Sequence, residues 1–496
     1  MDINYVSTRN AQDVRTASEA ILQGLAPDGG LYVPTAIPKL DLPLEKLGQM
    51  SYQEVAFEVL SRFLTDFTAE ELHDCINRAY DEKFDCPEIA PMVKAHGAYY
   101  LELFHGKTIA FKDMALSILP YLMTTAAKKQ GLNKEIVILT ATSGDTGKAA
   151  LAGFCDVPGT KIIVFYPKDG VSPIQKQQMV TQAGSNTYVI GIKGNFDDAQ
   201  TGVKKIFHDR EMAEELDGMG YQFSSANSIN IGRLVPQVVY YVYSCAKLLS
   251  DEEIKAGEKI NICVPTGNFG NILAAYYAKQ MGMPIDRLIC ASNSNKVLYD
   301  FFRTGDYDRR RDFHLTMSPS MDILISSNLE RLIYQILDRD PVKTSADMED
   351  LNQKGIAEID LDLLKKKVPD FYGNYASEEE TAAEIRAVYE DTGYVIDPHT
   401  AVASSVYEKY KEKTGDSTKT LIASTASPFK FTRTVLQAIG ADQPDKEDLD
   451  LTEDLSKIAN VEIPAAIREI KDAPVRHTTI CEVSEMPDEI RKILAK

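Results

Sequence analysis

Lys112 is the residue whose setting first indicates chemistry in this sequence. It opens an apolar segment in which Ala115, Leu116 and Leu119 recur at helical spacing. An ammonium group is costly to bury unless it is paired or has lost its proton. A surface lysine, whose stem covers apolar side chains while its amine reaches water, would also produce this pattern. Only a partly buried amine would be suited to act as a nucleophile or a base.

Two loops of small residues could bind anions. The first, "PTGNFGN", places Gly267 and Gly270 between an apolar strand and a helix. Glycines let backbone N–H groups approach an anion, although a tight turn has the same composition. The second, "TATSGDTG", offers hydroxyl groups at a helix start, where a plain helix cap is the alternative. Phe269 interrupts the dinucleotide fingerprint, and Thr142 and Ala149 interrupt the P-loop pattern, so neither loop matches a nucleotide motif.

A third polar cluster, "SSANSINIGRL", brings Asn227 and Ser228 close to Arg233. A guanidinium beside amide and hydroxyl donors suits a phosphate group, whereas a surface salt bridge is the simpler alternative. The seven histidines show no metal-ligand spacing and the seven cysteines form no CxxC pair. We therefore expect no metal site and no disulfide framework.

The elements that must position these residues follow one recurring pattern of strand, polar loop and helix. Apolar strands are expected at 99–104, 135–140, 259–264 and 419–424, each followed by a polar loop, with further strands at 160–167, 186–192 and 286–292. Continuous apolar strands that alternate with helices predict parallel sheets covered on both faces. Ligands of such sheets bind beyond the carboxyl ends of the strands, so the candidate residues should meet at that edge.

Composition limits the classes of partner. The chain has 54 basic and 73 acidic residues and a net charge of −19, which argues against nucleic-acid and anionic-membrane partners. No run of eighteen apolar residues occurs, and the N-terminus has no signal-peptide pattern. Scattered cysteines suit a reducing compartment. We expect a cytoplasmic protein with a small-molecule substrate.

A lysine amine, two anion-binding loops and no metal site together favour pyridoxal 5'-phosphate as the cofactor. The sequence also resembles the threonine synthase family of pyridoxal-phosphate enzymes, whose fold is the tryptophan-synthase-β-like fold type II. The motifs that carry the resemblance extend over nearly the whole chain and include "PDGGLYVP", "HGKTIAFKD", "SPSMDI", "DPHTAVA" and "STASPFKF".

The resemblance implies roles for individual residues. Lys112 would hold the cofactor through a Schiff base, Thr425 would meet the pyridine nitrogen, and Asp145 would lie beside the ring. The loop that binds the cofactor phosphate corresponds to Gly267, Asn268, Phe269, Gly270 and Asn271. The substrate-binding residues correspond to Thr142, Ser143, Gly144, Thr146, Asn227, Ser228 and Arg233.

The expected fold class is α/β, with the two doubly wound parallel-sheet lobes of the fold type II enzymes and a mainly helical N-terminal domain. We expect the N-terminal domain at 1–90 and the catalytic region at 91–440, with a small lobe at roughly 130–235 inserted in the large lobe. Residues 441–496 should form an acidic, mainly helical C-terminal segment.

The activity that the resemblance implies is the conversion of O-phospho-L-homoserine and water to L-threonine and phosphate, the last step of threonine biosynthesis from aspartate. Lys112 would remove and return protons during γ-elimination and the β-addition of water. A phospho-lyase that releases 2-oxobutyrate shares the early steps, and the motifs hardly separate the two. A non-catalytic binding protein of the same fold would not need Lys112, and a NAD-linked dehydrogenase lacks its fingerprint. The sequence leaves a monomer and a homodimer equally open.

Overall fold

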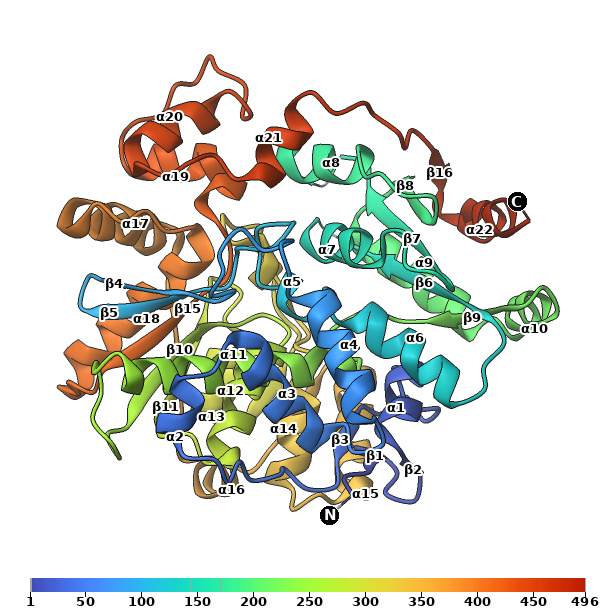
Figure 1. The fold of residues 1–496 in the computed structure, drawn as a ribbon, viewed down its shortest axis with the longest axis horizontal. Helices are drawn as coiled ribbons and strands as arrows, with labels where there is room; N and C mark the ends of the chain where they lie inside the picture. The colour runs from blue at the N-terminus through green and yellow to red at the C-terminus, as the bar shows by residue number, and fades with distance from the viewer. Residues whose placement is uncertain (1, 143, 170, 496) are drawn as a thin grey trace.

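The computed structural model describes residues 2–142, 144–169 and 171–495. It contains a large and a small parallel sheet, each covered by helices, with the N-terminal segment packed beneath and the C-terminal segment crossing above them in the orientation of Figure 1. This arrangement confirms the expected α/β class with two sheet-based lobes.

The N-terminal segment combines helices with a small antiparallel sheet. Three of its helices begin with a capping box, in which Thr16, Ser51 and Thr68 each pair with a glutamate three residues later. Such a box satisfies backbone groups at the helix start and fixes where the helix begins. The elements are β1 (Tyr5–Ser7), β2 (Val14–Arg15), α1 (Ala17–Gln23), β3 (Tyr32–Pro34), α2 (Leu44–Gly48), α3 (Tyr52–Phe63) and α4 (Ala69–Ala79).

The large sheet has six strands in the order β14-β11-β10-β15-β5-β4, all parallel except the edge strand β4. Alternate residues of the central strand β10 face opposite cores: Ile262 and Val264 join one hydrophobic cluster, and Cys263 joins the other. The strands are β4 (Met92–Ala95), β5 (Ala98–Glu102), β10 (Ile260–Pro265), β11 (Ile285–Ser292), β14 (Phe371–Tyr375) and β15 (Thr420–Ser424).

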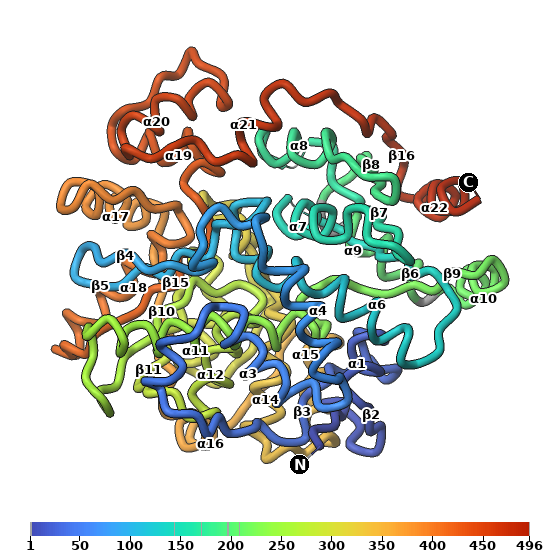
Figure 2. The backbone as a smooth tube through the Cα atoms, in the orientation of Figure 1, coloured from blue at the N-terminus to red at the C-terminus, as the bar shows by residue number. Residues whose placement is uncertain are grey.

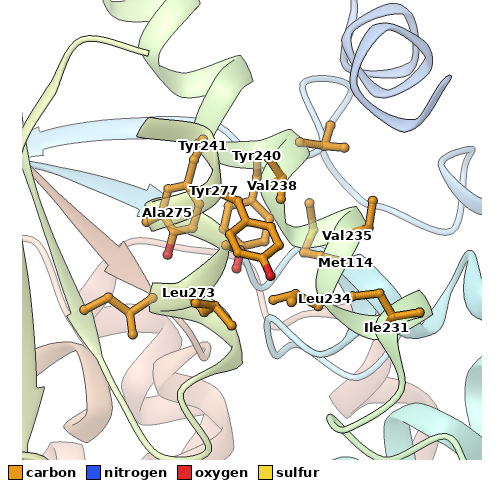
Figure 3. Close-up of a cluster of buried hydrophobic side chains, with 14 of the residues drawn as sticks. Met114, Ile231, Leu234, Val235, Val238, Tyr240, Tyr241, Leu273, Ala275 and Tyr277 are labelled. Atoms are coloured by element: carbon orange, nitrogen blue, oxygen red, sulfur yellow. The ribbon is translucent and has the colours of Figure 1, made fainter. Parts of the chain in front are cut away.

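The helices around the large sheet include the long apolar helix α11. Figure 3 shows its tyrosines Tyr240 and Tyr241 beside Tyr277 of α12, with Met114 of α5 at the border of the same buried cluster. The helices are α5 (Asp113–Leu116), α6 (Leu119–Lys129), α11 (Ile231–Ser250), α12 (Gly270–Met281), α13 (Val297–Thr304), α14 (Leu329–Ile336), α15 (Pro341–Lys354), α16 (Leu361–Lys367), α17 (Glu378–Thr392) and α18 (Pro398–Thr414). A two-stranded sheet of β12 (Asp306–Asp308) and β13 (Ile356–Glu358) and the short helices η1 (Pro319–Met321) and η2 (Pro428–Phe431) complete this lobe.

The small sheet has five parallel strands in the order β16-β8-β7-β6-β9. Four of them are β6 (Glu135–Ala141), β7 (Thr160–Pro167), β8 (Thr187–Lys193) and β9 (Tyr221–Ser224). Its helices are α7 (Asp145–Phe154), α8 (Pro173–Val180), α9 (Phe196–His208) and α10 (Arg210–Gly218). The fifth strand, β16 (Ile480–Glu482), comes from the C-terminal segment.

The C-terminal segment connects both lobes. Its first helices, α20 (Leu451–Ala459) and α21 (Ala465–Lys471), follow α19 (Thr432–Ala438) and share a core with the large lobe, in which Leu455 and Ile470 are buried. The chain then crosses to the small lobe (Figure 2), where β16 joins the edge of the sheet and is followed by η3 (Val483–Glu485) and α22 (Met486–Leu494). Ile490 of α22 is buried in the core of this lobe. The small lobe therefore includes residues beyond the expected 130–235.

Within the part of the chain that the structure describes, no helix is both long and apolar enough to cross a bilayer. The same residues contain no group of three or more histidine, cysteine, aspartate or glutamate side chains arranged to hold a metal ion.

Candidate active site

Lys112 precedes the short helix α5, and its side chain is only 11% exposed. Its Nζ lies 3.4 Å from the Ser320 Oγ and 3.7 Å from the Asp145 Oδ2. Burial lowers the pKa of Lys112 to about 8, a shift that the nearby cations Lys430 and Arg233 increase and Asp145 opposes. Because α5 has four residues, burial rather than a helix dipole is the main cause of the shift. The amine is therefore not the water-exposed group of an ordinary surface lysine.

Asp145 begins α7 at the carboxyl end of β6, and both of its oxygens are paired. Gln175 Nε2 donates to Oδ1 at 2.9 Å, and the fully buried Lys430 Nζ lies 2.9 Å from the same oxygen. Ser320 Oγ donates to Oδ2 at 2.8 Å. Burial would favour the neutral acid, but Lys430 and Lys112 outweigh it and hold the pKa of Asp145 well below its usual range. The site thus contains a fixed carboxylate beside the amine.

Ser320 is held in place by a buried histidine. The Ser320 backbone N–H donates to the His399 Nε2 at 3.1 Å, and the other ring nitrogen, Nδ1, lies 2.7 Å from the Asp397 Oδ2. This pattern requires the neutral tautomer with the proton on Nδ1. Asp397 also caps α18 through the backbone N–H groups of His399 and Thr400. The start of α18 therefore positions the loop that carries Ser320.

The glycine loop after β10 has the form of an anion cradle. No N–H group of residues 267–271 donates to an acceptor in the described part of the chain. A Cβ added at Gly267 would lie 2.6 Å from the Ser320 carbonyl oxygen, so only glycine permits this close packing. Phe269 takes a left-handed conformation at φ 67° and is buried against Phe371 and Phe302. These free donors at the start of α12 fit a phosphate group.

Some of the polar groups in the loop before α7 form hydrogen bonds within the loop itself. Thr142 Oγ1 accepts from the backbone N–H groups of Gly144 and Gly147, both at 2.9 Å. Gly144 has φ +139°, and a Cβ there would lie 2.5 Å from the Gln175 side chain. The N–H groups of Asp145 and Thr146 have no acceptor among the described residues and remain available to a ligand. Ser143, also expected in this loop, lies outside the described residues.

Arg233 is buried at the start of α11 and therefore does not form the surface salt bridge that the sequence left open as the simpler alternative. Its Nη1 donates to the Ala226 carbonyl at 2.7 Å, while its Nε has no partner among the described residues. Burial lowers the pKa of Arg233 to about 10, and none of the described carboxylates lies within ion-pair range of it. Asn227 and Ser228 are half-buried in the loop that precedes this helix. A buried guanidinium with an unused donor fits an anionic ligand.

Thr425 follows β15 and is almost fully buried. Its carbonyl accepts from the Phe111 N–H at 2.8 Å, which places this loop directly beside the segment of Lys112. The Thr425 hydroxyl has no hydrogen-bond partner among the described residues. The structure therefore brings Lys112, Asp145 and Thr425 to one edge, as the strand–loop–helix pattern predicts.

Sequence reasoning did not assign Ser320, Gln175, His399, Asp397 or Lys430 to the site. Ser320, His399 and Lys430 lie in "SPSMDI", "DPHTAVA" and "STASPFKF", which carried the family resemblance but suggested no contact with Lys112. Gln175 lies in none of the motifs that carried the family resemblance.

Comparisons with known proteins assign three family models to the chain. They are described as "Threonine synthase N terminus" for residues 4–80, "Pyridoxal-phosphate dependent enzyme" for 84–426 and "Threonine synthase, C-terminal" for 400–489. Threonine synthase of Schizosaccharomyces pombe is 37% identical over 470 residues, which cover 88% of this chain and 90% of that protein. Human threonine synthase-like 1 is 42% identical over 434 residues, and the match spans 85% of this chain but 58% of that longer protein.

Solved structures are similar over the whole chain. The PLP-bound threonine synthase from Brucella melitensis has a TM-score of 0.87 and 34% identity, and the match covers 99% of both chains. Yeast threonine synthase has the same TM-score at 32% identity and 99% coverage of both chains.

Proposed function

The chain belongs to the threonine synthase family of pyridoxal-phosphate-dependent enzymes, and from that premise we propose that it converts O-phospho-L-homoserine and water into L-threonine and phosphate. The observation that carries the proposal is the pairing of a buried amine, Lys112, with a buried guanidinium, Arg233, that has no carboxylate partner among the described residues. The substrate has a C–H bond whose proton Lys112 could remove and a phosphate that Arg233 could bind.

The residues present fit pyridoxal phosphate. The N–H groups of residues 267–271, which have no acceptor in the described part of the chain, would hold its phosphate. Lys112 would hold its aldehyde carbon, and Thr425 would meet its ring nitrogen. When bound, the cofactor supplies an electron sink that makes the protons on the α- and β-carbons of the substrate acidic. A hydroxyl partner for the ring nitrogen stabilises the protonated ring less than a carboxylate would.

Lys112 is suited to move protons at the substrate carbons. Its lowered pKa makes a useful fraction of the amine neutral near pH 8, where a general base is most effective. Ser320 Oγ donates to Asp145 and can accept a hydrogen bond from Lys112, so it would orient the amine when it is not bound to the cofactor. We assign Lys112 the removal of the α proton and the return of protons to the product.

The substrate phosphate would lie between the two helix starts. Among the described residues, Arg233 Nε has no partner and the N–H groups of Asp145 and Thr146 at the start of α7 have no acceptor. Asn227, Ser228 and the hydroxyl of Thr146 would add donors from the loops beside them. Because these groups come from both lobes, closure of the small lobe on the substrate would bring them together and exclude water.

All seven cysteines are unpaired, which supports a reducing compartment such as the cytoplasm as the place of the reaction.

Product analysis of the purified protein, loaded with pyridoxal phosphate and given O-phospho-L-homoserine, tests the proposal. We expect threonine and phosphate in equal amounts. Lys112→Ala should abolish turnover, while Lys129→Ala, which removes a surface lysine on α6 paired with Glu71, should not. Arg233→Gln should raise KM by roughly 10- to 100-fold, because it removes charge-assisted hydrogen bonds to the phosphate.

Two results would overturn the proposal. Phosphate accompanied by 2-oxobutyrate rather than threonine would make the protein a phospho-lyase, an outcome that matters because several relatives are named threonine synthase-like 1. Cofactor binding without any turnover of O-phospho-L-homoserine would make it a binding protein or an enzyme with another substrate.

A further inference from the structure

Arg331 is a fully buried arginine that the reaction described above does not use. It lies in α14 and is the largest fully buried side chain among the described residues. It forms no ion pair with any carboxylate in the described ranges. Burial lowers its pKa to about 10. An unpaired buried charge is expensive, so its surroundings must compensate for the lost hydration.

The compensation comes from three separate segments of the chain. Arg331 Nε donates to the Tyr32 carbonyl at 2.9 Å, and Nη2 donates to the Ile229 carbonyl at 2.6 Å. Nη1 donates to the Asn328 Oδ1. Tyr32 belongs to β3 of the N-terminal segment, and Ile229 lies in the loop 225–230 before α11. One planar guanidinium thus joins segments that are far apart in the sequence.

Asn328 continues the connection to the glycine loop. Because its Oδ1 accepts from Arg331, its Nδ2 is directed to the Asn268 carbonyl at 2.9 Å. The Asn328 backbone N–H donates to the same carbonyl at 3.0 Å. Through this side chain Arg331 reaches the loop 266–271 that would hold the cofactor phosphate.

The N-terminal segment is also bound to the residue next to Arg331. Glu330 accepts from the Thr8 hydroxyl at 2.5 Å and forms a two-pronged pair with Arg9, with distances of 2.9 and 2.8 Å. The start of α14 is therefore anchored on the N-terminal side by Glu330, while Arg331 faces the two loops of the site.

We propose that Arg331 is a positioning residue that sets the spacing between the loop 266–271 and the loop 225–230, and so between the cofactor phosphate and the substrate phosphate. The inference rests on the proposed function for the identity of the second phosphate. It goes beyond that function because Arg331 would act through the two loops: its guanidinium donates to Tyr32, Ile229 and Asn328. A residue that only anchored the N-terminal segment would affect folding but not the two phosphate sites.

Arg339 provides a matched control. Its Nη2 donates to the Pro34 carbonyl at 2.8 Å, two residues from Tyr32, and among the described residues it forms no hydrogen bond to either phosphate loop. Arg331→Lys and Arg339→Lys therefore each replace a guanidinium that donates one hydrogen bond to the N-terminal segment, but only the first removes the connections to the site.

The experiment measures the dissociation constant of pyridoxal phosphate in the apoprotein by fluorescence titration, steady-state kinetics with O-phospho-L-homoserine, and the unfolding temperature. For Arg331→Lys we expect the cofactor dissociation constant and KM to rise about 10-fold each, with kcat changed by less than about 3-fold, because the lost hydrogen bonds act on binding geometry. For Arg339→Lys we expect both constants to stay near their original values. Equal changes in both variants, or a fall in unfolding temperature with unchanged binding, would overturn the proposal.

A second variant keeps the test decisive if Arg331→Lys does not fold. Asn328→Ala leaves the bonds to Tyr32 and Ile229 but removes the side-chain connection to Asn268. It should raise the cofactor dissociation constant several-fold while KM changes less. An unchanged cofactor dissociation constant would overturn the proposal. Because cofactor titration needs no substrate, this result is independent of whether O-phospho-L-homoserine is turned over.

Discussion

Removing the charge of Asp145 should lower the pKa of Lys112. Its carboxylate lies 3.7 Å from the Lys112 Nζ and favours the protonated amine. At that separation two unit charges interact by about 4.5 kcal/mol at an effective dielectric of about 20 and by about 1 kcal/mol in water. Since one pKa unit corresponds to about 1.4 kcal/mol, Asp145→Asn should lower the pKa by roughly 1 to 3 units.

Removing the charge of Lys430 should have the opposite sign. Lys430 disfavours a second positive charge at Lys112, so Lys430→Met should raise the pKa of Lys112 from about 8. Methionine retains most of the apolar stem, which limits the change in packing. The two variants should therefore shift the pKa of the same amine in opposite directions.

The assay is competitive acylation of the apoprotein with limiting reagent at a series of pH values. The extent of modification of the Lys112 peptide, read by mass spectrometry, gives the fraction of neutral amine at each pH. Asp488→Asn on α22, far from the site in Figure 1, serves as the charge control and should leave the curve unchanged. A pKa that is unchanged or raised in Asp145→Asn, or a shift of the same sign in Asp145→Asn and Lys430→Met, would refute the electrostatic account.

Three further outcomes can be checked separately. Gly267→Ala should weaken cofactor binding much more than Gly270→Ala in fluorescence titrations, because the new Cβ would lie 2.6 Å from a backbone oxygen at the first position but at ordinary contact distance at the second; equal effects would contradict this. Lys430→Met should reduce the free energy of unfolding, measured by denaturant titration, by about 3–5 kcal/mol, because it leaves the Asp145 carboxylate without its closest cation. Adding Asp145→Asn to this variant should restore part of the loss, whereas additive losses would argue against a coupled pair. Ile490→Ala should cost about 2–5 kcal/mol and lower the hydrogen-exchange protection of β8, since α22 covers the small sheet; unchanged protection there would show that the C-terminal segment does not stabilise that lobe.

The strands that the sequence predicts best are the buried ones. The segments expected at 135–140, 160–167 and 259–264 match β6, β7 and β10 to within a residue or so, because buried parallel strands are apolar on both faces. The pattern does not reveal β14, which is half-buried and contains Gly373, or β16, which has three residues. A strand so short is defined only by the neighbour that it pairs with.

For the site, the pattern of residues predicts the kind of chemistry and the sheet edge at which it would take place. Lys112, the glycine loop at 266–271 and Thr425 each follow a recognisable strand, so topology alone brings them to the same edge. The surroundings of the amine, in contrast, follow from the packing of the folded chain. The carboxylate of Asp145 meets Ser320 and Lys430, which are 175 and 285 residues away along the chain. Hydrogen bonds and Coulomb interactions act across space over a few ångströms, so the partners that set the protonation of Lys112 are fixed by packing and leave no local pattern in the sequence.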